Sequence, residues 1–436
     1  MKTNSAESTE PVHSGGKTAW KPRQKFTFRF FLLFSGITSI LCWAFNIYQD
    51  LLGLSYKSIY AFYKPLAGLL YWLDKHIYHT GYNPGTMRSI PLDNHYGAIY
   101  YLTVFFFSLI AAFTWGLADK KKRNYDTLFY WFNLFLRYTL AITILGYGID
   151  KIIPVQMPYP NVFFLKLPFG DFSRNDLLWN FIGVSPGYSI FSGACETIAG
   201  LLLLSRRTAV FGYVFLLTIL GNVVALNWFY NITVKLYSSL LLLYTIYLLA
   251  PYAANLFRLF FKGVPVVIPQ QRRVFRTRWK GYLLTAVLVL FPLIYLARVA
   301  ITAKKYYGEV ADGLNEQKMY KVTSFTIKDS LTQIAPDTLR WKHIFLWPHS
   351  GYFVTWDMSD KYNQYLFKTD SLKRTYTFTK PGKIVEVLNY TYSPKNILQL
   401  TGKWKGKNIQ VSLTLSPVDS IRLNKERITL VHPDED

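Results

Sequence analysis

The sequence predicts an α-helical polytopic membrane protein of about seven transmembrane helices, followed by a C-terminal antiparallel β-barrel or sandwich domain. Three observations lead to this prediction. Hydrophobic residues make up 51% and aromatic residues 18% of the 436 positions, more than one soluble domain usually carries. The apolar residues gather in runs near the roughly 20 residues that a spanning helix needs. After residue 300 these runs give way to alternating patterns typical of strands.

Seven apolar segments have a length suited to a bilayer core. They are Phe28–Ile47, Ala98–Leu117, Leu128–Ile149, Ser189–Ser205, Ala209–Phe229, Leu236–Leu256 and Gly281–Ala300. Residues 1–27 form a polar tail, and no small-residue cleavage site follows the first segment. We therefore expect that segment to be a retained anchor. Pro251 and Pro292 are candidate interruptions of the last two segments, because proline removes a helical hydrogen bond.

Lysine and arginine are unevenly distributed between the two sides that seven spans define. The basic segments are the tail, Lys120–Arg123, Arg206–Arg207 and the loop 257–280 with its run Arg272–Lys280, and all four fall on one side. Short cytoplasmic loops are enriched in both residues. We therefore predict a multi-pass protein of the cell inner (cytoplasmic) membrane, with a cytoplasmic N-terminus and an extracytoplasmic C-terminal domain. The formal net charge of +24 then reflects topology and contact with anionic lipids, and nucleic-acid binding is not expected.

The first part of the chain, residues 28–127, holds two spans and the segment between them. Asp50–Ile77 repeats apolar residues at helical spacing with lysines off that stripe, which predicts an interfacial or partly re-entrant helix on the outer face. The stretch His76–His95 contains three of the seven histidines. Because H-x-x-H with one distant histidine does not fix a ligand geometry, we expect solvated loop residues there and no metal site.

Several missing patterns limit the chemistry. The seven spans contain no histidine, so a haem held between helices by imidazoles is not expected. The chain has neither a phosphate loop of the form G-x-x-x-x-G-K nor a zinc helix of the form H-E-x-x-H, which argues against a nucleotide cofactor and against metalloprotease activity. Cys42 and Cys195 lie in separate spans without a C-x-x-C motif, so we interpret them as small residues in helix contacts.

One pattern resembles a hydrolase motif but is better explained by a helix start. Gly183–Gly187 reads G-V-S-P-G, which matches the G-x-S-x-G of a nucleophile elbow. Such an elbow needs the backbone N–H of the residue after the serine, and Pro186 has none. We therefore predict that Ser185 is the N-cap of a helix whose first residue is Pro186.

The region 301–436 alternates apolar and polar residues between turn signals, and it is long enough for a core of its own. The expected strands are Tyr320–Ile327, Gly351–Asp357, Tyr362–Lys368, Thr375–Thr379, Ile384–Tyr392, Asn408–Leu415 and Arg427–Val431. Four tryptophans fall in this region, Trp341, Trp347, Trp356 and Trp404. We expect most of them to pack in the core, with lining of a barrel interior as the alternative.

Two charges lie within adjacent apolar segments, Arg137 in the third and Glu196 in the fourth. A charge in hydrocarbon costs several kcal/mol unless it has a partner. Counting about 1.5 Å per residue from opposite faces places the two at similar depth, so we predict a buried pair, with Asn222 joining from the next helix. The alternative is a buried pair that only fixes helix register.

A set of motifs between Leu128 and Leu256 carries a family resemblance. In order they are Ile144–Lys151 (ILGYGIDK), Pro154–Pro158 (PVQMP), Phe191–Glu196 (FSGACE), Gly200–Thr208 (GLLLLSRRT) and Asn227–Lys235 (NWFYNITVK). In this order and spacing the chain resembles the DoxX family, in particular its longer members with a C-terminal extracytoplasmic domain. The resemblance implies a four-helix core over residues 128–256. It also implies an aspartate where Asn231 stands, so an acid–base role at that position is in doubt.

The resemblance implies a broad range of roles, including thiosulfate–quinone oxidoreductase subunits, accessory proteins and cargo receptors. In carboxylase-like relatives a lysine matching Lys151 is thought to act as a base beside a quinone-like cofactor. A lysine can do so only when its pKa is lowered. The alternative is a lysine that reaches the outer headgroups, and the same alternative holds for Lys235.

These residues and motifs leave three functions open. The first is an accessory or ligand-binding component of a quinone-linked membrane redox process, with Lys151 and Glu196 as catalytic candidates and Lys151, Gln156, Asn227 and Lys235 as ligand contacts. The second is a non-catalytic membrane partner or assembly factor that recognises a protein through its outer β domain. The third is a small-solute transporter, for which the expected inverted repeat is not seen in the sequence.

Overall fold

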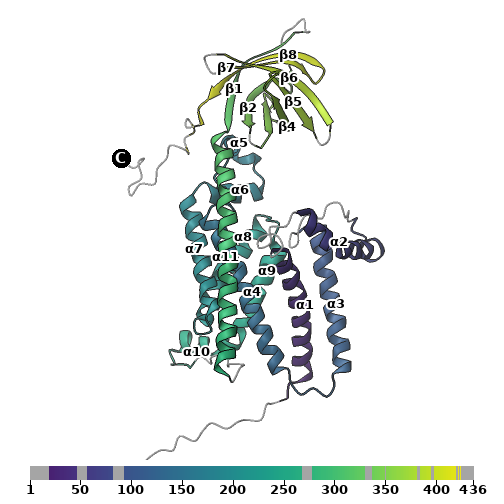
Figure 1. Ribbon diagram of the computed structural model, residues 1–436, viewed down its shortest axis with the longest axis vertical. Coiled ribbons are helices and arrows are strands. Elements are labelled where there is room, and N and C mark those ends of the chain that lie inside the picture. The colour runs from purple at the N-terminus through teal and green to yellow at the C-terminus, as the bar shows by residue number, and fades with distance from the viewer. Residues whose placement is uncertain are drawn as a thin grey trace, which may run out of the picture. The chain divides into compact units, whose positions relative to one another are not determined.

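The computed structural model describes residues 19–46, 56–81, 93–267, 277–328, 336–348, 350–380, 383–393, 397–418, 421 and 423. Its contacts divide the chain into two compact units. The helical unit consists of Met1–Ile149 and Ala194–Val299, and the barrel unit of Asp150–Gly193 and Ala300–Asp436. Figure 1 labels the elements of both.

The helices whose bounds the structure describes lie between residues 22 and 315. They are α1 (Pro22–Asn46), α2 (Tyr56–Leu73) with the π-helical turn η2 (Asp74–Tyr78), α3 (His95–Ala118), α4 (Asp126–Ile152), α5 (Val162–Lys166), the 3-10 turn η4 (Phe169–Asp171), α6 (Arg174–Gly183), α7 (Pro186–Leu204), α8 (Ala209–Phe229), α9 (Lys235–Leu249), η5 (Ala250–Tyr252), α10 (Ala253–Lys262) and α11 (Arg278–Asn315). α4, α7 and α11 are continuous helices that contribute residues to both units.

The chain is a multi-pass membrane protein. Among the described residues five helical stretches are long and apolar enough to cross a membrane: His95–Ala118, Asp126–Ile152, Pro186–Leu204, Ala209–Phe229 and Lys235–Lys262. They include five of the seven predicted spans. The other two predicted spans lie on α1, as far as Asn46, and on α11.

The sixth predicted span, Leu236–Leu256, is not one continuous helix. α9 ends at Leu249, a 3-10 turn contains Pro251, and α10 follows. α10 places Phe257, Phe260 and Phe261 on its surface, with 53%, 67% and 78% exposure. Such an aromatic face on a short helix is typical of an interfacial segment. Pro292, by contrast, lies inside α11 without ending it.

The helix predicted between the first two spans is present. α2 and η2 cover Tyr56–Tyr78, and the rest of the predicted segment, before Tyr56, lies outside the described residues. Figure 1 shows α2 lying across the direction of its neighbour α3. η2 ends where the Asp74 carboxylate accepts hydrogen bonds from the Thr80 backbone N–H and hydroxyl, at 2.8 and 2.6 Å. Leu69 and Trp72 are about half exposed, as expected for a helix in a membrane interface.

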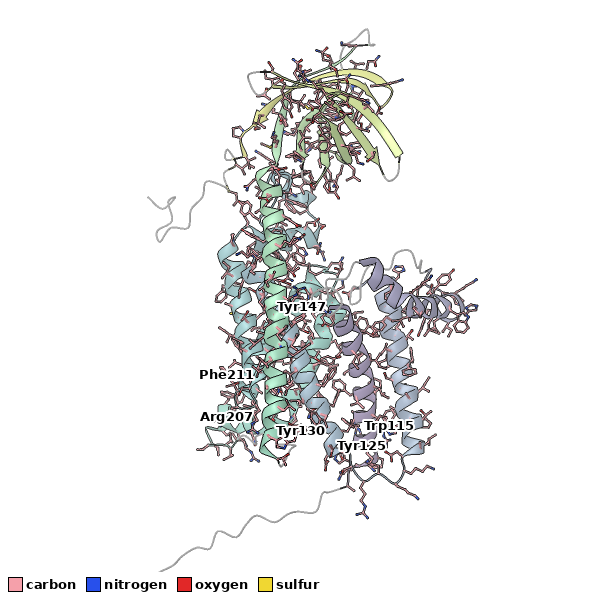
Figure 2. The ribbon with its side chains drawn as sticks, in the orientation of Figure 1. Trp115, Tyr125, Tyr130, Tyr147, Arg207 and Phe211 are labelled. Carbon is pink, nitrogen blue, oxygen red and sulfur yellow. The ribbon has the colours of Figure 1, made fainter. Side chains whose placement is uncertain are left out.

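A buried arginine joins one end of α1 to α3 and α4. Arg29 is 5% exposed and donates to the Tyr125 hydroxyl at 2.9 and 2.6 Å, and that hydroxyl donates to Asp119 Oδ2 at 2.7 Å. The guanidinium also lies 5.9 Å from the centroid of the Trp115 ring. Figure 2 shows Trp115 and Tyr125 at this end of the helical unit. A buried guanidinium is tolerated when its charge has such partners, so the network fixes this end of the bundle.

The C-terminal region is a closed antiparallel β-barrel of eight strands in sequential order. They are β1 (Lys318–Ile327), β2 (Trp341–Trp347), β3 (Tyr352–Asp357), β4 (Tyr362–Asp370), β5 (Thr375–Lys380), β6 (Lys383–Ser393), β7 (Ile397–Trp404) and β8 (Lys407–Ser416). β1 pairs with β8, which closes the barrel. The β7–β8 hairpin turns through Lys405 and Gly406, both at positive φ of 47° and 80°, the backbone that a tight two-residue hairpin requires.

The barrel interior is filled by alternate apolar residues. Trp404 is 1% exposed, and its ring centroid lies 5.0 Å from Trp341, 5.1 Å from Tyr365 and 5.2 Å from Phe378. Of the four tryptophans in the region, Trp341 and Trp404 therefore lie in the interior core. Trp347 and Trp356 lie in a second cluster on the outer wall.

The outer wall of β2 and β3 is covered by α5. Val162, Phe163 and Leu167 pack against Phe345 and Val354. This cover explains why the sequence did not predict β2: both of its faces are apolar, so the alternation that identifies a strand is lost. β7 was also missed, and the strand predicted at Arg427–Val431 lies outside the described residues.

His343 on β2 makes the stability of the barrel depend on pH. Its ring lies beside Phe345 and Trp356, and burial lowers its pKa, with neighbouring lysine charges lowering it further. The folded state therefore disfavours the protonated imidazole. We expect His343 to cost no stability above its ordinary pKa of 6.5, and to destabilise the barrel increasingly as pH falls from there through the lowered folded pKa.

We expect the denaturation midpoint of the barrel to fall on acidification over this range, and to fall less in His343→Leu. The measurement is tryptophan fluorescence against denaturant, repeated at several pH values. The same pH dependence in both proteins would show that His343 does not carry it.

Candidate functional site

A cavity of about 770 Å³ opens within the barrel unit. Three parts of the chain surround it: the segment 158–180 with α5 and α6, the last turns of α11, and the outer wall of β2, β3 and β4. We call it the aromatic pocket. Its lining residues are Pro158, Tyr159, Pro160, Asn161, Phe163, Phe164, Asp176, Trp179, Asn180, Tyr306, Glu309, Val310, Gly313, Leu314, Gln317, Trp347, Ser350, Tyr352, Val354, Tyr362 and Gln364.

One face of α11 forms a side of the pocket. Tyr306, Glu309, Val310, Gly313 and Leu314 line it, and their spacing of three and four residues places them on the same helical face. A Cβ at Gly313 would meet no atom within 4 Å, so this position opens onto free space. Relative to the predicted end of the span at residue 300, these residues lie about 9 to 21 Å farther along the helix.

The segment before α7 holds its polar side chains in place through helix caps. Asn161 Oδ1 accepts from the Phe164 N–H at 3.1 Å and caps α5. Ser173 caps α6, accepting from the Asp176 N–H at 3.0 Å and donating to the Asp176 carboxylate at 2.6 Å. The Ser173 hydroxyl thus bonds both the backbone and the carboxylate of Asp176. Because caps fix side-chain direction, Asn161 and Asp176 are positioned before any ligand arrives.

The strands contribute residues from their outward face. Val354 pairs with Gln364, and Trp347 pairs with Tyr352 in the neighbouring strands. Lining positions on one strand are two residues apart, as Tyr352 and Val354 are, because alternate side chains share a face. The Tyr362 ring makes an edge-to-face contact with Phe163, with centroids 4.9 Å apart. The packing of α5 on the barrel therefore also shapes the wall of the pocket.

The charge of the pocket differs from that of the chain. Among the residues that the structure describes, its lining contains two carboxylates, Asp176 and Glu309, and no lysine or arginine, although the chain holds 49 of these basic residues. Burial raises the pKa of Tyr159, so this phenol stays protonated at neutral pH. An anionic ligand would meet no positive side chain here and would be repelled by the two carboxylates.

The charged residues predicted in the spans are buried but offset. Arg137 on α4 is 4% exposed and Glu196 on α7 is 3% exposed. A Cβ at Gly200 would lie 3.1 Å from the Ala141 carbonyl, and Tyr138 donates to the Leu204 carbonyl at 3.0 Å. In this antiparallel register, Glu196 lies level with a position on α4 about nine residues after Arg137. The two residues are therefore about 13 Å apart along the helix axis, with Arg137 nearer the N-terminal end of α4.

The equal depth predicted for Arg137 and Glu196 is therefore wrong, because the count treated both helices as starting at a membrane face, whereas α4 is 27 residues long and α7 only 19. Their pairing stays a prediction. Asn222 is not a buried member of such a cluster: it is exposed on the outward face of α8 with Phe211 and Thr218. Asn227, on the same helix, is 8% exposed.

Lys235 lies in a local network at the start of α9. Its Nζ donates to Asn231 Oδ1 and to the Ile232 carbonyl, both at 3.0 Å, and lies 3.6 Å from Asp93 Oδ2. The same Asp93 carboxylate accepts from the backbone N–H of Lys235 and, at 3.1 Å, of Leu236. Asp93 therefore caps α9, and sequence reasoning missed it. Asn231 has φ of 55°, a left-handed conformation that asparagine tolerates better than most residues.

Lys151 and Gln156 belong to the barrel unit. Lys151 is buried, with 7% exposure, and whether it acts as a base or reaches the outer headgroups stays a prediction. Its carbonyl accepts from the Ser189 hydroxyl at 3.0 Å. Gln156 Oε1 is buried and, among the described residues, has no hydrogen-bond partner.

The predicted start of α7 is confirmed, since the helix begins at Pro186 and Ser185 Oγ accepts from the Tyr188 N–H at 3.4 Å.

The sequence did not reveal the aromatic pocket. Two local signals were available: the capping motif Ser173–Asp176, and the spacing of Tyr306, Glu309, Val310 and Gly313 along one helix face. Neither signal shows that these segments meet in the folded chain.

In the part of the chain that the structure describes, no three metal-ligating side chains come together.

The fold defines a class: a multi-pass α-helical membrane protein with a C-terminal eight-stranded barrel. Comparison with known proteins adds little to this class. No family model matches the chain, and no solved structure matches it. The uncharacterized protein YwoB of Bacillus subtilis (strain 168) is 37% identical over 73 residues, which is 17% of this chain. The match spans 47% of that relative's length, less than half.

Proposed function

We propose that this chain is a membrane-anchored binding protein, in which the spanning helices tether the barrel unit outside the cell inner membrane and the aromatic pocket captures a small polar ligand. The observation that carries the proposal is the pocket itself. Its size falls within the range of about 300 to 1,000 Å³ typical of ligand sites. Its polar side chains converge from three separate segments, and helix caps orient two of them.

A non-catalytic role agrees with the chemistry of the lining. Glu309 and Asp176 are both acids, and the Asp176 carboxylate accepts a hydrogen bond from the Ser173 hydroxyl. Among the lining residues that the structure describes there is no cysteine, histidine or lysine to serve as a nucleophile or as a base near neutral pH. His349, which follows Trp347 and Pro348 in the sequence, lies outside the described residues. The side chains present are suited to hold a ligand by hydrogen bonds and ring contacts.

The test fills the pocket without touching a hydrogen-bonding group. In Gly313→Trp the new side chain enters the open space of the pocket. The matched control is Gly308→Trp, on the same helix, also without neighbours within 4 Å and not part of the lining. The full chain in mild detergent is incubated with concentrated culture medium of the source cells and analysed by native mass spectrometry.

We expect a bound compound in the wild type and in Gly308→Trp, and none in Gly313→Trp. The proposal would be overturned if no compound binds, or if both variants retain it equally. A compound that proves to be a protein would instead favour a non-catalytic partner that recognises proteins through its outer domain.

We also propose, as the alternative, that the helical core belongs to a DoxX-like component of a quinone-linked process. Its support is the burial of Lys151, Glu196 and Asn227 within apolar helices, because buried polar side chains in spanning segments are by default functional candidates. The same purified protein distinguishes the two proposals. A quinone found in its organic extract, unaffected by Gly313→Trp and lost in Lys151→Ala/Glu196→Gln, would favour the alternative.

A further inference from the structure

We propose that the aromatic pocket binds an uncharged oligosaccharide of two or three sugar rings. This inference rests on the proposed function and names the ligand class of the same site. It follows from four properties of the pocket: its charge, its unused hydrogen-bonding groups, its aromatic surfaces and its volume.

The charge excludes acidic ligands. With Asp176 and Glu309 as its charged residues, the described lining has no side chain that pairs with a phosphate, a sulfate or a carboxylate. Anion sites in proteins are built from arginine, lysine or exposed backbone N–H groups at helix starts. Nucleotides, phosphorylated metabolites and acidic sugars are therefore outside the ligand class.

The amide side chains offer both donors and acceptors. Gln317 Oε1 accepts from the Val162 N–H at 2.9 Å, and Asn161 Oδ1 accepts from the Phe164 N–H, which leaves the NH₂ group of each for a ligand. Asn180 Nδ2 donates to the Asp176 carbonyl at 2.7 Å, which leaves its oxygen. A cationic ligand offers donors alone and would leave the two NH₂ groups without acceptors. Each hydroxyl of a sugar is both donor and acceptor, so it satisfies the whole set.

Aromatic rings supply the apolar part of the surface. Trp179, Trp347, Tyr306, Tyr352 and Tyr362 all line the pocket. The Trp179 N–H is directed to Asn175 Oδ1 at 2.8 Å, which holds the indole in one orientation. The negative face of an aromatic ring attracts the weakly positive C–H groups that cover one side of a sugar ring. Rings together with oriented amides are thus complementary to a carbohydrate.

The volume sets the length of the ligand. A cavity of about 770 Å³ accepts a compound of roughly drug size, which corresponds to two or three sugar rings. The Tyr306, Tyr352 and Tyr362 side chains, 53%, 37% and 48% exposed, keep the cavity open to solvent. The ligand can therefore be a free oligosaccharide or the end of a longer neutral glycan.

The test measures binding of defined sugars to the full chain in nanodiscs by saturation-transfer NMR and calorimetry. The probes are neutral di- to tetrasaccharides (malto-, cello-, manno- and N-acetylchito-oligosaccharides), sialyllactose as an acidic probe, and the glucosamine trimer and spermidine as cationic probes. We expect at least one neutral series to bind, and sialyllactose not to bind.

Neighbouring tyrosines on α11 provide a matched pair of variants. Tyr306→Ala removes a lining residue, whereas Tyr307→Ala removes the next residue, which is similarly exposed and is not part of the lining. We expect Tyr306→Ala to weaken binding of the neutral sugar at least about tenfold and Tyr307→Ala to leave it within about twofold. Trp347→Ala serves as a second lining variant on a different element.

The outcomes separate this inference from the proposed function. Binding of the cationic probes alone, no binding across the neutral panel, or equal weakening by both tyrosine variants overturns the oligosaccharide assignment. If the native mass spectrometry nevertheless finds a compound that Gly313→Trp excludes, the proposed function stands with another ligand class. If it finds none, both fail together.

Discussion

Gly200→Leu is expected to lower the apparent free energy of unfolding of the helical unit by about 3 kcal/mol or more. Gly200 lies at a close contact between α7 and α4: a Cβ there would stand 2.5 Å from Leu145 Cγ and 3.1 Å from the Ala141 carbonyl oxygen. The carbonyl is backbone and cannot move aside, so a leucine must push the two helices apart. Spanning helices associate largely through such close packing at small residues.

The measurement is denaturation of the full chain in mixed micelles, followed by circular dichroism. Gly146→Leu is the matched control, since Gly146 also lies on a spanning helix and its Cβ would meet nothing within 4 Å. We expect its stability to change by less than about 1 kcal/mol. Equal destabilisation by both substitutions would show that the contact between α4 and α7 is not responsible.

Trp404→Ala is expected to destabilise the barrel by about 3 to 5 kcal/mol, the usual cost of removing a buried tryptophan. Its indole touches Trp341, Tyr365 and Phe378, which come from β2, β4 and β5. It therefore joins strands on opposite sides of the barrel. Its removal leaves a cavity that rigid neighbouring rings do not fill.

Pulse proteolysis of the full chain against urea measures this effect, because cleavage reports the unfolded fraction of the exposed barrel. The control is Leu372→Ala in the turn after β4, where the side chain is 98% exposed. We expect this control to stay within about 0.5 kcal/mol of the wild type. An unchanged midpoint in Trp404→Ala would contradict the packing described for the interior.

The barrel strands differ in how plainly the sequence predicts them. A predicted strand such as Tyr362–Lys368 has one face on the interior core and one face in solvent, so its alternation is visible in the sequence. β3 was predicted although α5 also covers its outer face. β2 has α5 on its outer face, and its second half, Ile344–Trp347, is an apolar run without alternation. β7 alternates Leu398 and Leu400 with polar residues, yet its glycine and lysine resemble a turn. Its place is set by pairing with β6 and β8.

The packing of the helices, like the pairing of β7, could be predicted only in part from the sequence. The burial of Arg137 and Glu196 was predictable, because charges in apolar segments must be covered by protein. Their relative depth was not, since it depends on how far α7 slides along α4, and Gly200 against Ala141 and Leu145 sets that register. Asn222 looks similar in sequence to Asn227, yet one is exposed and the other is buried.

The sequence by itself determined that the chain is a multi-pass membrane protein, where its apolar helices lie, and that an antiparallel β domain follows them. These properties depend on composition and on periods of two and 3.6 residues, which are local. Only the tertiary structure decided that the barrel closes, that α5 covers its β2–β3 wall, and that residues near 160, 310 and 355 meet in the aromatic pocket. Those contacts join segments far apart in the chain, and no local pattern records which distant surface a side chain will meet.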